Sequence, residues 1–158
     1  MDELASRPVA RQGEVVPVRT KRWNDPRGED DGYRLLVCRY RPRGVARTDE
    51  TWDAWCKALG PSEALHADFY GKSGGAPLAD ADYHRRFLEE MSRQRYWIDG
   101  FAVHVRRGDT ITLLCSSACT DPARCHRTLL ASLLEEAAFP RLLRAEPSSA
   151  RVIRRRAL

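Results

Sequence analysis

Three cysteines and a histidine stand close together near the carboxyl end of the chain. Cys115, Cys119 and Cys125 precede His126, which directly follows the last of them. A thiolate can act as a nucleophile or a metal ligand, and an imidazole can move protons near neutral pH. One hypothesis is therefore an enzyme site in which Cys115 or Cys125 attacks a substrate or His126 transfers protons.

The same residues allow two other interpretations. Cys115, Cys119, Cys125 and His126, together with Cys38, could hold zinc, iron or haem, because these metals accept thiolate and imidazole ligands. The spacing C-x3-C-x5-C-H is not that of a standard zinc finger, and adjacent Cys and His residues rarely bind one ion. Alternatively, the cysteines pack as small hydrophobic residues and His126 fills or caps the core. The spacing alone leaves the three interpretations open.

Five arginines are candidates for binding an anion beside the cysteines. Arg124 and Arg127 adjoin the cysteine segment, and Arg39, Arg41 and Arg43 alternate at the end of a predicted strand. A guanidinium group suits bidentate recognition of phosphate or carboxylate. The alternative is a solvated strand end with scattered ion pairs. The enzyme hypothesis predicts a small anionic substrate, either nucleotide-like or derived from nucleic acid.

Predicted strands and helices alternate along the chain. The predicted strands cover residues 15–23, 33–40 and 111–115. The predicted helices cover residues 63–70, 79–97 and 122–139, with one more between a cap at Thr48 or Asp49 and Leu59. Residues 101–107 fit a strand or a helix. The alternation predicts a single compact α/β domain with a mostly parallel sheet flanked by helices. Ligands of such sheets bind outside the carboxyl ends of the strands.

The last predicted helix should direct two candidate residues inward. Cys125 and His126 each begin a row of apolar residues spaced by four, so both fall on the apolar face of the helix at its amino end. This helix end carries a partial positive charge, which lowers the pKa of a nearby thiol. We therefore expect Cys125 and His126 to point toward Cys115.

The length and the charge limit the function classes. A chain of 158 residues with 27 Lys plus Arg and 22 Asp plus Glu suits one domain. We predict an amino-terminal arm over 1–14, the α/β domain over 15–140 and a basic tail over 141–158. The tail holds six arginines and one glutamate, which is the whole net charge of +5. Such a tail is a solvated surface segment or a loose nucleic-acid contact, and the second possibility would suit a non-enzymatic nucleic-acid-binding protein.

Hydropathy and cysteine usage indicate a location. No apolar run approaches the ~20 residues that a membrane span requires. The first thirteen residues lack the apolar stretch of a signal peptide. We therefore expect a cytoplasmic protein without a membrane partner, in which cysteines are reduced rather than paired.

Two sequence blocks resemble the family known as domain of unknown function 488, including its YeaO-like members. The blocks cover residues 21–45 with 52–65, and residues 111–115 with 125–127. The resemblance implies a compact α/β fold and favours a helix over 99–107, but it implies no particular reaction. Family members often have an acid at the position of Cys38 and a shorter loop where this chain has Cys119. The chain therefore resembles a cysteine-rich variant of the family.

Overall fold

The computed structural model describes residues 18–140, so the predicted arm and tail lie outside the described residues. In chain order the elements are β1 (Arg19–Arg22), β2 (Tyr33–Leu36), β3 (Ala54–Trp55), α1 (Glu63–Phe69), α2 (Asp80–Ser92), α3 (Arg95–Arg106), β4 (Ile111–Cys115) and α4 (His126–Ala138). Short 3₁₀ turns lie at Glu29–Asp31, Arg47–Asp49, Lys57–Leu59 and Pro122–Arg124. The predicted α/β fold with a parallel sheet is confirmed.

The strands form one parallel sheet in the order β1-β4-β2-β3. The central strand β4 places Leu114 opposite both Lys21 of β1 and Leu36 of β2. Because the three strands run in the same direction, their carboxyl ends meet at one edge of the sheet. The loops that leave this edge carry the predicted site residues.

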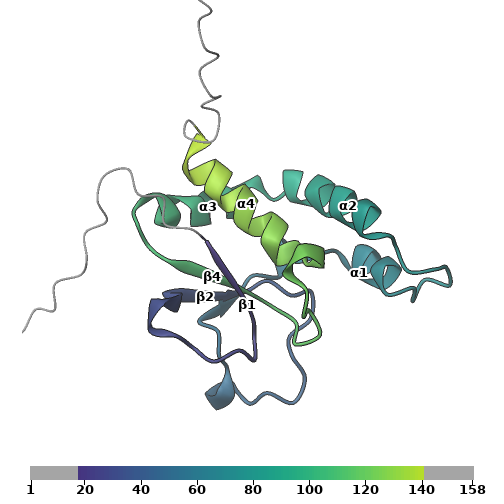
Figure 1. Ribbon diagram of the computed structural model, residues 1–158, viewed down its shortest axis with the longest axis horizontal. Helices are drawn as coiled ribbons and strands as arrows, with labels where there is room; N and C mark the ends of the chain where they lie inside the picture. Colours follow the sequence, from purple (N-terminus) through teal and green to yellow (C-terminus); the bar gives the residue numbers. More distant parts are fainter. Residues whose placement is uncertain (1–17, 141–158) are drawn as a thin grey trace, which may run out of the picture.

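The two faces of the sheet are covered differently. Successive residues of a strand point to opposite faces. Leu35 and Leu113 pack in the main core, which also contains Phe87 of α2 and Leu130 of α4. Figure 1 shows the helices gathered on one side of the sheet. The next residues along the strands, including Leu36, pack with tryptophans of the connecting loops in a second cluster. Cys38, Cys115 and Cys125 also belong to this second cluster.

A buried ion network fixes the loop between β1 and β2. Arg34 donates to Oδ2 of Asp31 at 2.9 Å and to the carbonyl of Asp25 at 3.0 Å. Lys21 Nζ lies 2.6 Å from Oδ1 of Asp31, and the Thr112 hydroxyl donates to the Asp31 carbonyl at 2.7 Å. Asp31 and Arg34 are fully buried. Each charge thus has a partner, which offsets the cost of its burial.

The prediction of a helix that ends at Leu59 is wrong. Its segment forms a 3₁₀ turn, the edge strand β3 and a second 3₁₀ turn. Ala54 and Trp55 pair with Leu35 and Leu36 of β2. The apolar residues on either side of β3 enter different clusters, because Trp52 lies in the second cluster whereas Cys56 and Leu59 lie in the main core. Their spacing by three and four therefore serves two faces of a sheet rather than one face of a helix.

Several predicted boundaries also change. The helix predicted over 79–97 is two helices, α2 and α3, with a break after Ser92. Residues 101–106 belong to α3, which settles the ambiguous segment as helical. The strand predicted over 33–40 ends at Leu36, so the arginines that follow lie in a loop and do not alternate on a strand. The strands expected over 111–115 and the helix over 63–70 are found as β4 and α1.

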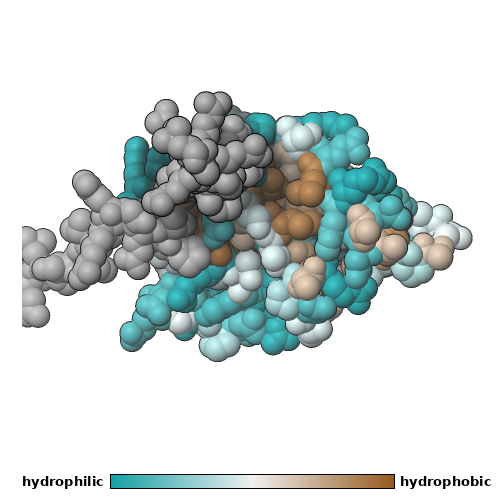
Figure 2. Space-filling model, turned by 45° about the horizontal axis from the view of Figure 1, so that its top comes forward, coloured by the Kyte–Doolittle hydropathy of each residue, from teal (hydrophilic) through white to brown (hydrophobic). Residues whose placement is uncertain are grey.

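The helical side of the molecule is polar over most of its surface. Figure 2 shows this side with apolar residues gathered near the middle of the view and hydrophilic residues around them. Within residues 18–140, no helix is long and apolar enough to cross a membrane.

Candidate functional site

The loop after β4 brings the cysteines together. β4 ends at Cys115, and Asp121 begins a 3₁₀ turn by accepting a hydrogen bond from the Ala123 backbone at 2.9 Å. Asp121 and Pro122 were expected to open the long helix directly, but α4 begins at His126. Cys125 is the cap residue in extended conformation just before α4. The chain therefore returns to the end of β4 at the point where α4 starts.

Three sulfur atoms form a compact group at this point. The Sγ atoms of Cys115, Cys119 and Cys125 all lie within 4.8 Å of one another. Cys115 and Cys125 are buried, and Cys119 is partly exposed. Cys38 also lies in contact with Cys115 but outside this closest group. Cys56 packs in the main core, as its sequence spacing predicts. We call Cys115, Cys119 and Cys125 the thiol cluster.

Hydrogen bonding fixes the tautomer of His126. Its Nε2 lies 2.8 Å from the carbonyl oxygen of Val37, which can only accept, so Nε2 carries the proton. In the neutral ring, Nδ1 therefore has a free lone pair. This atom lies 3.9 Å from Cys115 Sγ, 4.0 Å from Cys125 Sγ and 3.4 Å from the Tyr83 hydroxyl. Burial lowers the pKa of His126, which keeps the ring neutral. Nδ1 can thus accept a proton or bind a metal.

The thiol cluster holds its charge on Cys119. Hydrogen bonds from the Cys115 thiol and, to a smaller extent, from the Cys125 thiol lower the pKa of Cys119 to about 3. Donation to Cys119 raises the pKa of Cys115, and hydrogen bonding to Cys115 and Cys119 raises that of Cys125. Two neutral thiols therefore stabilise one thiolate. Cys119 is also the most exposed residue of the thiol cluster.

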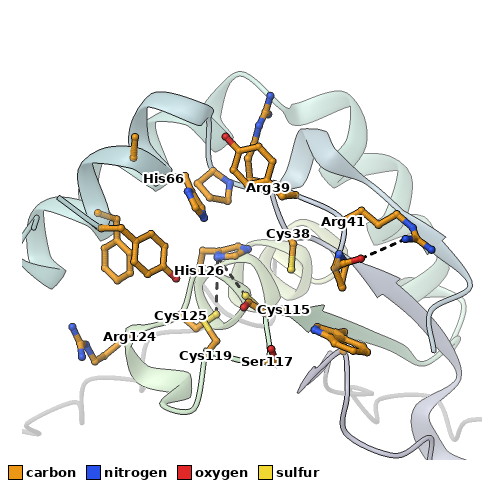
Figure 3. Close-up of a pocket in the computed structure, with 18 of the residues that line it drawn as sticks. Cys38, Arg39, Arg41, His66, Cys115, Ser117, Cys119, Arg124, Cys125 and His126 are labelled. Atoms are coloured by element: carbon orange, nitrogen blue, oxygen red, sulfur yellow. Dashed lines mark hydrogen bonds between the residues drawn. The ribbon is translucent and has the colours of Figure 1, made fainter. Parts of the chain in front are cut away.

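The thiol cluster lies at a cavity of about 610 Å³. Figure 3 shows the labelled cysteines beside His126 within this cavity. The cavity is also lined by five cationic side chains, which are Arg39, Arg41, Arg43, Lys72 and Arg124. No Asp or Glu is among its lining residues in the described part of the chain. The cavity is therefore suited to an anion.

The arginines of the cavity differ in how far protein groups occupy them. Arg41 donates to Glu50 at 2.6 Å and to the Val45 carbonyl at 2.8 Å, and it stacks over Trp52. In Figure 3 its guanidinium group turns away from the thiol cluster. Arg39 has a long 3.3 Å contact with Glu63, a side chain that is 69% exposed. Arg41 therefore holds its own loop, whereas Arg39 remains available to a ligand.

The other three cationic side chains also differ in whether a protein group occupies them. Arg43 and Lys72 make no ion pair within residues 18–140. Arg124 uses Nε for both carboxylate oxygens of Asp80, at 2.9 and 3.1 Å. Arg43 and Lys72 are exposed, so an entering anion would meet them first.

The structure does not bring Arg127 to the cavity. Arg127 is buried, and its Nε and Nη1 have no hydrogen-bond partner within the described residues. It is absent from the residues that line the cavity. Its charge still helps to lower the pKa of Cys119, after the larger effects of the neighbouring thiols. Arg127 therefore acts on the thiol cluster through its electric field.

The sequence did not indicate the aromatic wall of the cavity. Tyr40, His66, Phe69, Tyr70 and Tyr83 all line it. Four of these come from α1, the residue after it and α2, which lie far from the cysteines in the chain. Their spacing in the sequence indicates helices that pack against the core. Their position in the wall of the cavity depends on the tertiary fold, which local spacing does not show.

The spacing of the ligand atoms also suits a metal ion. A tetrahedral zinc with bonds of ~2.3 Å to sulfur and ~2.0 Å to nitrogen separates its ligand atoms by roughly 3.5–3.8 Å. The Nδ1 to sulfur distances of 3.9 and 4.0 Å approach this value. The Val37 carbonyl would hold the outer nitrogen of the ring, as carbonyls commonly do for metal-bound histidines. Cys115, Cys119 and Cys125 could therefore hold a metal together, with His126 Nδ1 beside Cys115 and Cys125.

Comparison with known proteins places the chain in a family. A family model described as the active DUF488-N3 subclade matches residues 18–138. The chain is 36% identical over 77 residues to the uncharacterized protein YeaO of Escherichia coli K12, which is 48% of this chain and 63% of that protein. It is 31% identical over 74 residues to the uncharacterized protein Rv3073c of Mycobacterium tuberculosis H37Rv, which is 47% of this chain and 59% of that protein. The chain thus matches about three fifths of these relatives' length. No solved structure matches it.

Proposed function

The chain belongs to the active DUF488-N3 subclade, and we propose that it is an enzyme that uses the thiol cluster to act on a small anionic substrate, nucleotide-like or derived from nucleic acid. The observation that carries the proposal is the meeting of three thiols and five cationic side chains at one cavity without a lining carboxylate. Arg39, Arg43, Lys72 and Arg124 would bind the substrate anion.

Cys119 is the nucleophile in this proposal. Cys119 is a partly exposed residue, and its low pKa makes it a thiolate at neutral pH. The sequence placed Cys115 and Cys125 in this role and Cys119 only among possible metal ligands. The proposal assigns the role to Cys119 instead, because Cys115 and Cys125 are buried and stay protonated as donors to Cys119.

The proposed step is a nucleophilic displacement in which the Cys119 sulfur is the attacking atom. Cys119 Sγ forms a bond to the electrophilic atom of the substrate while the bond to the leaving group breaks, and the leaving group departs with the electron pair. A phosphate leaves as an anion without a proton, and the cationic side chains of the cavity stabilise its charge. His126 lines the cavity, and its Nδ1 lone pair can accept the proton of the water that later attacks the group on sulfur. Water or an acceptor would release the group from sulfur.

Alkylation with iodoacetamide at pH 5 tests the proposal on the full chain. Cys119 should react as a thiolate, whereas Cys56, whose pKa burial raises, serves as the internal control. Inorganic pyrophosphate should slow the reaction by occupying the cavity, and Arg43→Gln should weaken that protection. Peptide mass spectrometry assigns the modified cysteine. Reaction of Cys119 no faster than that of Cys56, or no protection at millimolar pyrophosphate, would contradict the proposal.

A metal-thiolate centre is the second candidate for the same residues. The specific observation is the convergence of three sulfurs within ligand spacing, with a free ring nitrogen beside two of them, those of Cys115 and Cys125. Zinc suits a ligand set of three thiolates and one imidazole, whereas iron or haem would use fewer of these protein ligands. A bound metal would take the lone pairs of Cys119 and suppress its alkylation.

Native mass spectrometry of the chain purified without chelator decides between the candidates. A metal centre predicts one bound zinc or iron in the mass spectrum, or a Soret band for haem in an absorption spectrum. In both cases Cys115→Ser should lose the metal. A metal-free chain in which added Zn²⁺ does not slow the alkylation of Cys119 would eliminate this candidate.

A further inference from the structure

We infer that Tyr40, His66 and Tyr70 form a subsite that receives the base of a nucleoside phosphate, while Arg43 and Lys72 receive its phosphate. This inference deepens the proposed function and rests on it for the reacting end of the substrate. Neither the sequence nor the family assigns a role to these three rings.

The rings form a continuous row along one wall of the cavity. The Tyr40 and His66 rings lie 5.1 Å apart between centroids, and those of His66 and Tyr70 lie 4.9 Å apart. Phe69 continues the row, 5.1 Å from Tyr70 and 4.3 Å from Tyr83. All five rings line the cavity. The wall therefore presents ring surface along its whole length.

The row joins the entrance of the cavity to the thiol cluster. Tyr40 and Tyr70 are 53% and 44% exposed, so their rings are open to a ligand. Tyr83 is buried at the other end, with its hydroxyl 3.4 Å from His126 Nδ1. A ligand whose flat ring stacks near the entrance would therefore lie in the same cavity that the thiol cluster lines.

Positive charge lies directly beside the exposed rings. Lys72 Nζ lies 5.4 Å from the centroid of the Tyr70 ring. Burial, followed by the charges of Lys72 and Arg39, lowers the pKa of His66. His66 is therefore neutral at pH 7 and adds ring surface without a further charge. A ligand that combines a flat ring with an anionic group matches this arrangement.

The chemistry of nucleotides fits these neighbours. Every base has an aromatic face that stacks on Tyr or His, whatever its sequence identity. A phosphate accepts hydrogen bonds from Arg and Lys. The cavity of about 610 Å³ is within the ~300–1,000 Å³ of ordinary ligand pockets. A simple phosphate would leave the ring wall without a function, so the two features together point to a nucleotide.

Calorimetry on the full chain tests the subsite with AMP, ribose 5-phosphate and inorganic pyrophosphate as probes. AMP should bind at least tenfold more tightly than ribose 5-phosphate, because only AMP has a base. Tyr40→Ala and Tyr70→Leu should each reduce this preference without weakening ribose 5-phosphate. Arg43→Gln should weaken both ligands. Tyr96→Ala is the matched control, because Tyr96 is 82% exposed and does not line the cavity.

The outcomes separate this inference from the proposed function. Equal binding of AMP and ribose 5-phosphate would overturn the ring subsite and leave the anion site standing. Failure of all three probes to bind would count against both. A 5′-phosphorylated single strand compared with AMP identifies the source of the nucleotide: tighter binding of the strand points to a chain end, and tighter binding of AMP to a free nucleotide. In either case, Tyr70→Leu must weaken the tighter ligand.

Discussion

Cys119 differs from its neighbours because of where its sulfur lies. Cys115 is fixed at the end of a buried strand and Cys125 at the start of a packed helix, whereas Cys119 comes from the loop between them. The two fixed thiols donate to the sulfur of the loop residue. A residue that the sequence marks only as a possible metal ligand thereby has the lowest pKa of the three thiols.

Removing one donor should make Cys119 less reactive in acid. In Cys125→Ala, Cys119 loses a hydrogen bond that stabilises its thiolate, so its pKa should rise from about 3. The rate of iodoacetamide alkylation at pH 4 should fall several-fold relative to the wild type, while the rates at pH 8 should differ little. Cys56→Ala, which removes a thiol of the main core, is the control. Identical pH profiles for Cys125→Ala and the wild type would show that Cys125 does not support the thiolate.

His126 should make the fold less stable as the pH falls. Burial lowers its pKa below 6.5 in the folded chain, so the unfolded chain binds the proton more readily. The stabilisation from the neutral ring is complete above about pH 6.5, and it is lost at up to ~1.4 kcal/mol per pH unit below it. His126→Gln keeps a donor for the Val37 carbonyl but does not titrate. Its free energy of unfolding should therefore decline less between pH 7.5 and 5.5.

Urea denaturation across this pH range provides the measurement. His104→Gln is the control, because the side chain of His104 is 56% exposed. A decline in His126→Gln as steep as that of the wild type would show that another group titrates.

At the scale of elements, a glycine permits the approach that positions His126. Gly60 follows the 3₁₀ turn Lys57–Leu59, and a Cβ there would lie 2.9 Å from the carbonyl oxygen of Val37, the hydrogen-bond partner of His126. Gly60→Ala should push this backbone away and reduce the free energy of unfolding by about 1–3 kcal/mol. Gly100→Ala is the control, because a Cβ there meets nothing within 4 Å and α3 should gain roughly 0.5–1 kcal/mol. Denaturant titration should rank the two variants on opposite sides of the wild type.

Local signals predicted the elements that carry the thiol cluster. The apolar run Ile111–Cys115 is β4, and the Ser62 side chain caps α1 by accepting from Leu65. Spacing by four placed Cys125 and His126 on the inward face of a helix; both are buried, but Cys125 precedes α4 as its cap residue. The loop that holds Cys119 has no such period, so its path depends on the packing at both of its ends. No local signal could therefore show which sulfur carries the charge.

Residues from distant segments were harder to predict than those from one segment. Tyr40 and His66 touch only because the loop after β2 passes α1. The arginines after β2 were expected to alternate on a strand, but the strand ends at Leu36. Leaving the strand lets Arg39, Arg41 and Arg43 reach the same cavity. The early end of β2 therefore places these arginines at the cavity, and the apolar pattern of the sequence did not show where the strand ends.

At the scale of the whole molecule, net charge and local charge have separate origins. The excess of +5 lies in residues 141–158, so residues 1–140 are neutral overall. The cavity nevertheless gathers five cationic side chains and no lining carboxylate in the described part of the chain. An anion could therefore bind the chain in two ways: by shape and contact in the cavity, or by charge alone through the tail.

Neutralising three tail arginines should separate these two kinds of binding. Arg154, Arg155 and Arg156 form an unbroken cationic run, and each contact with a single strand contributes about −0.7 to the slope of log affinity against log salt. Substituting all three by Gln should make that slope less negative by up to about 2 for an unphosphorylated single strand. Binding of AMP should not change, since its proposed contacts lie in the cavity. Fluorescence anisotropy at several salt concentrations measures the slope, and an unchanged slope would exclude nucleic-acid binding through these arginines.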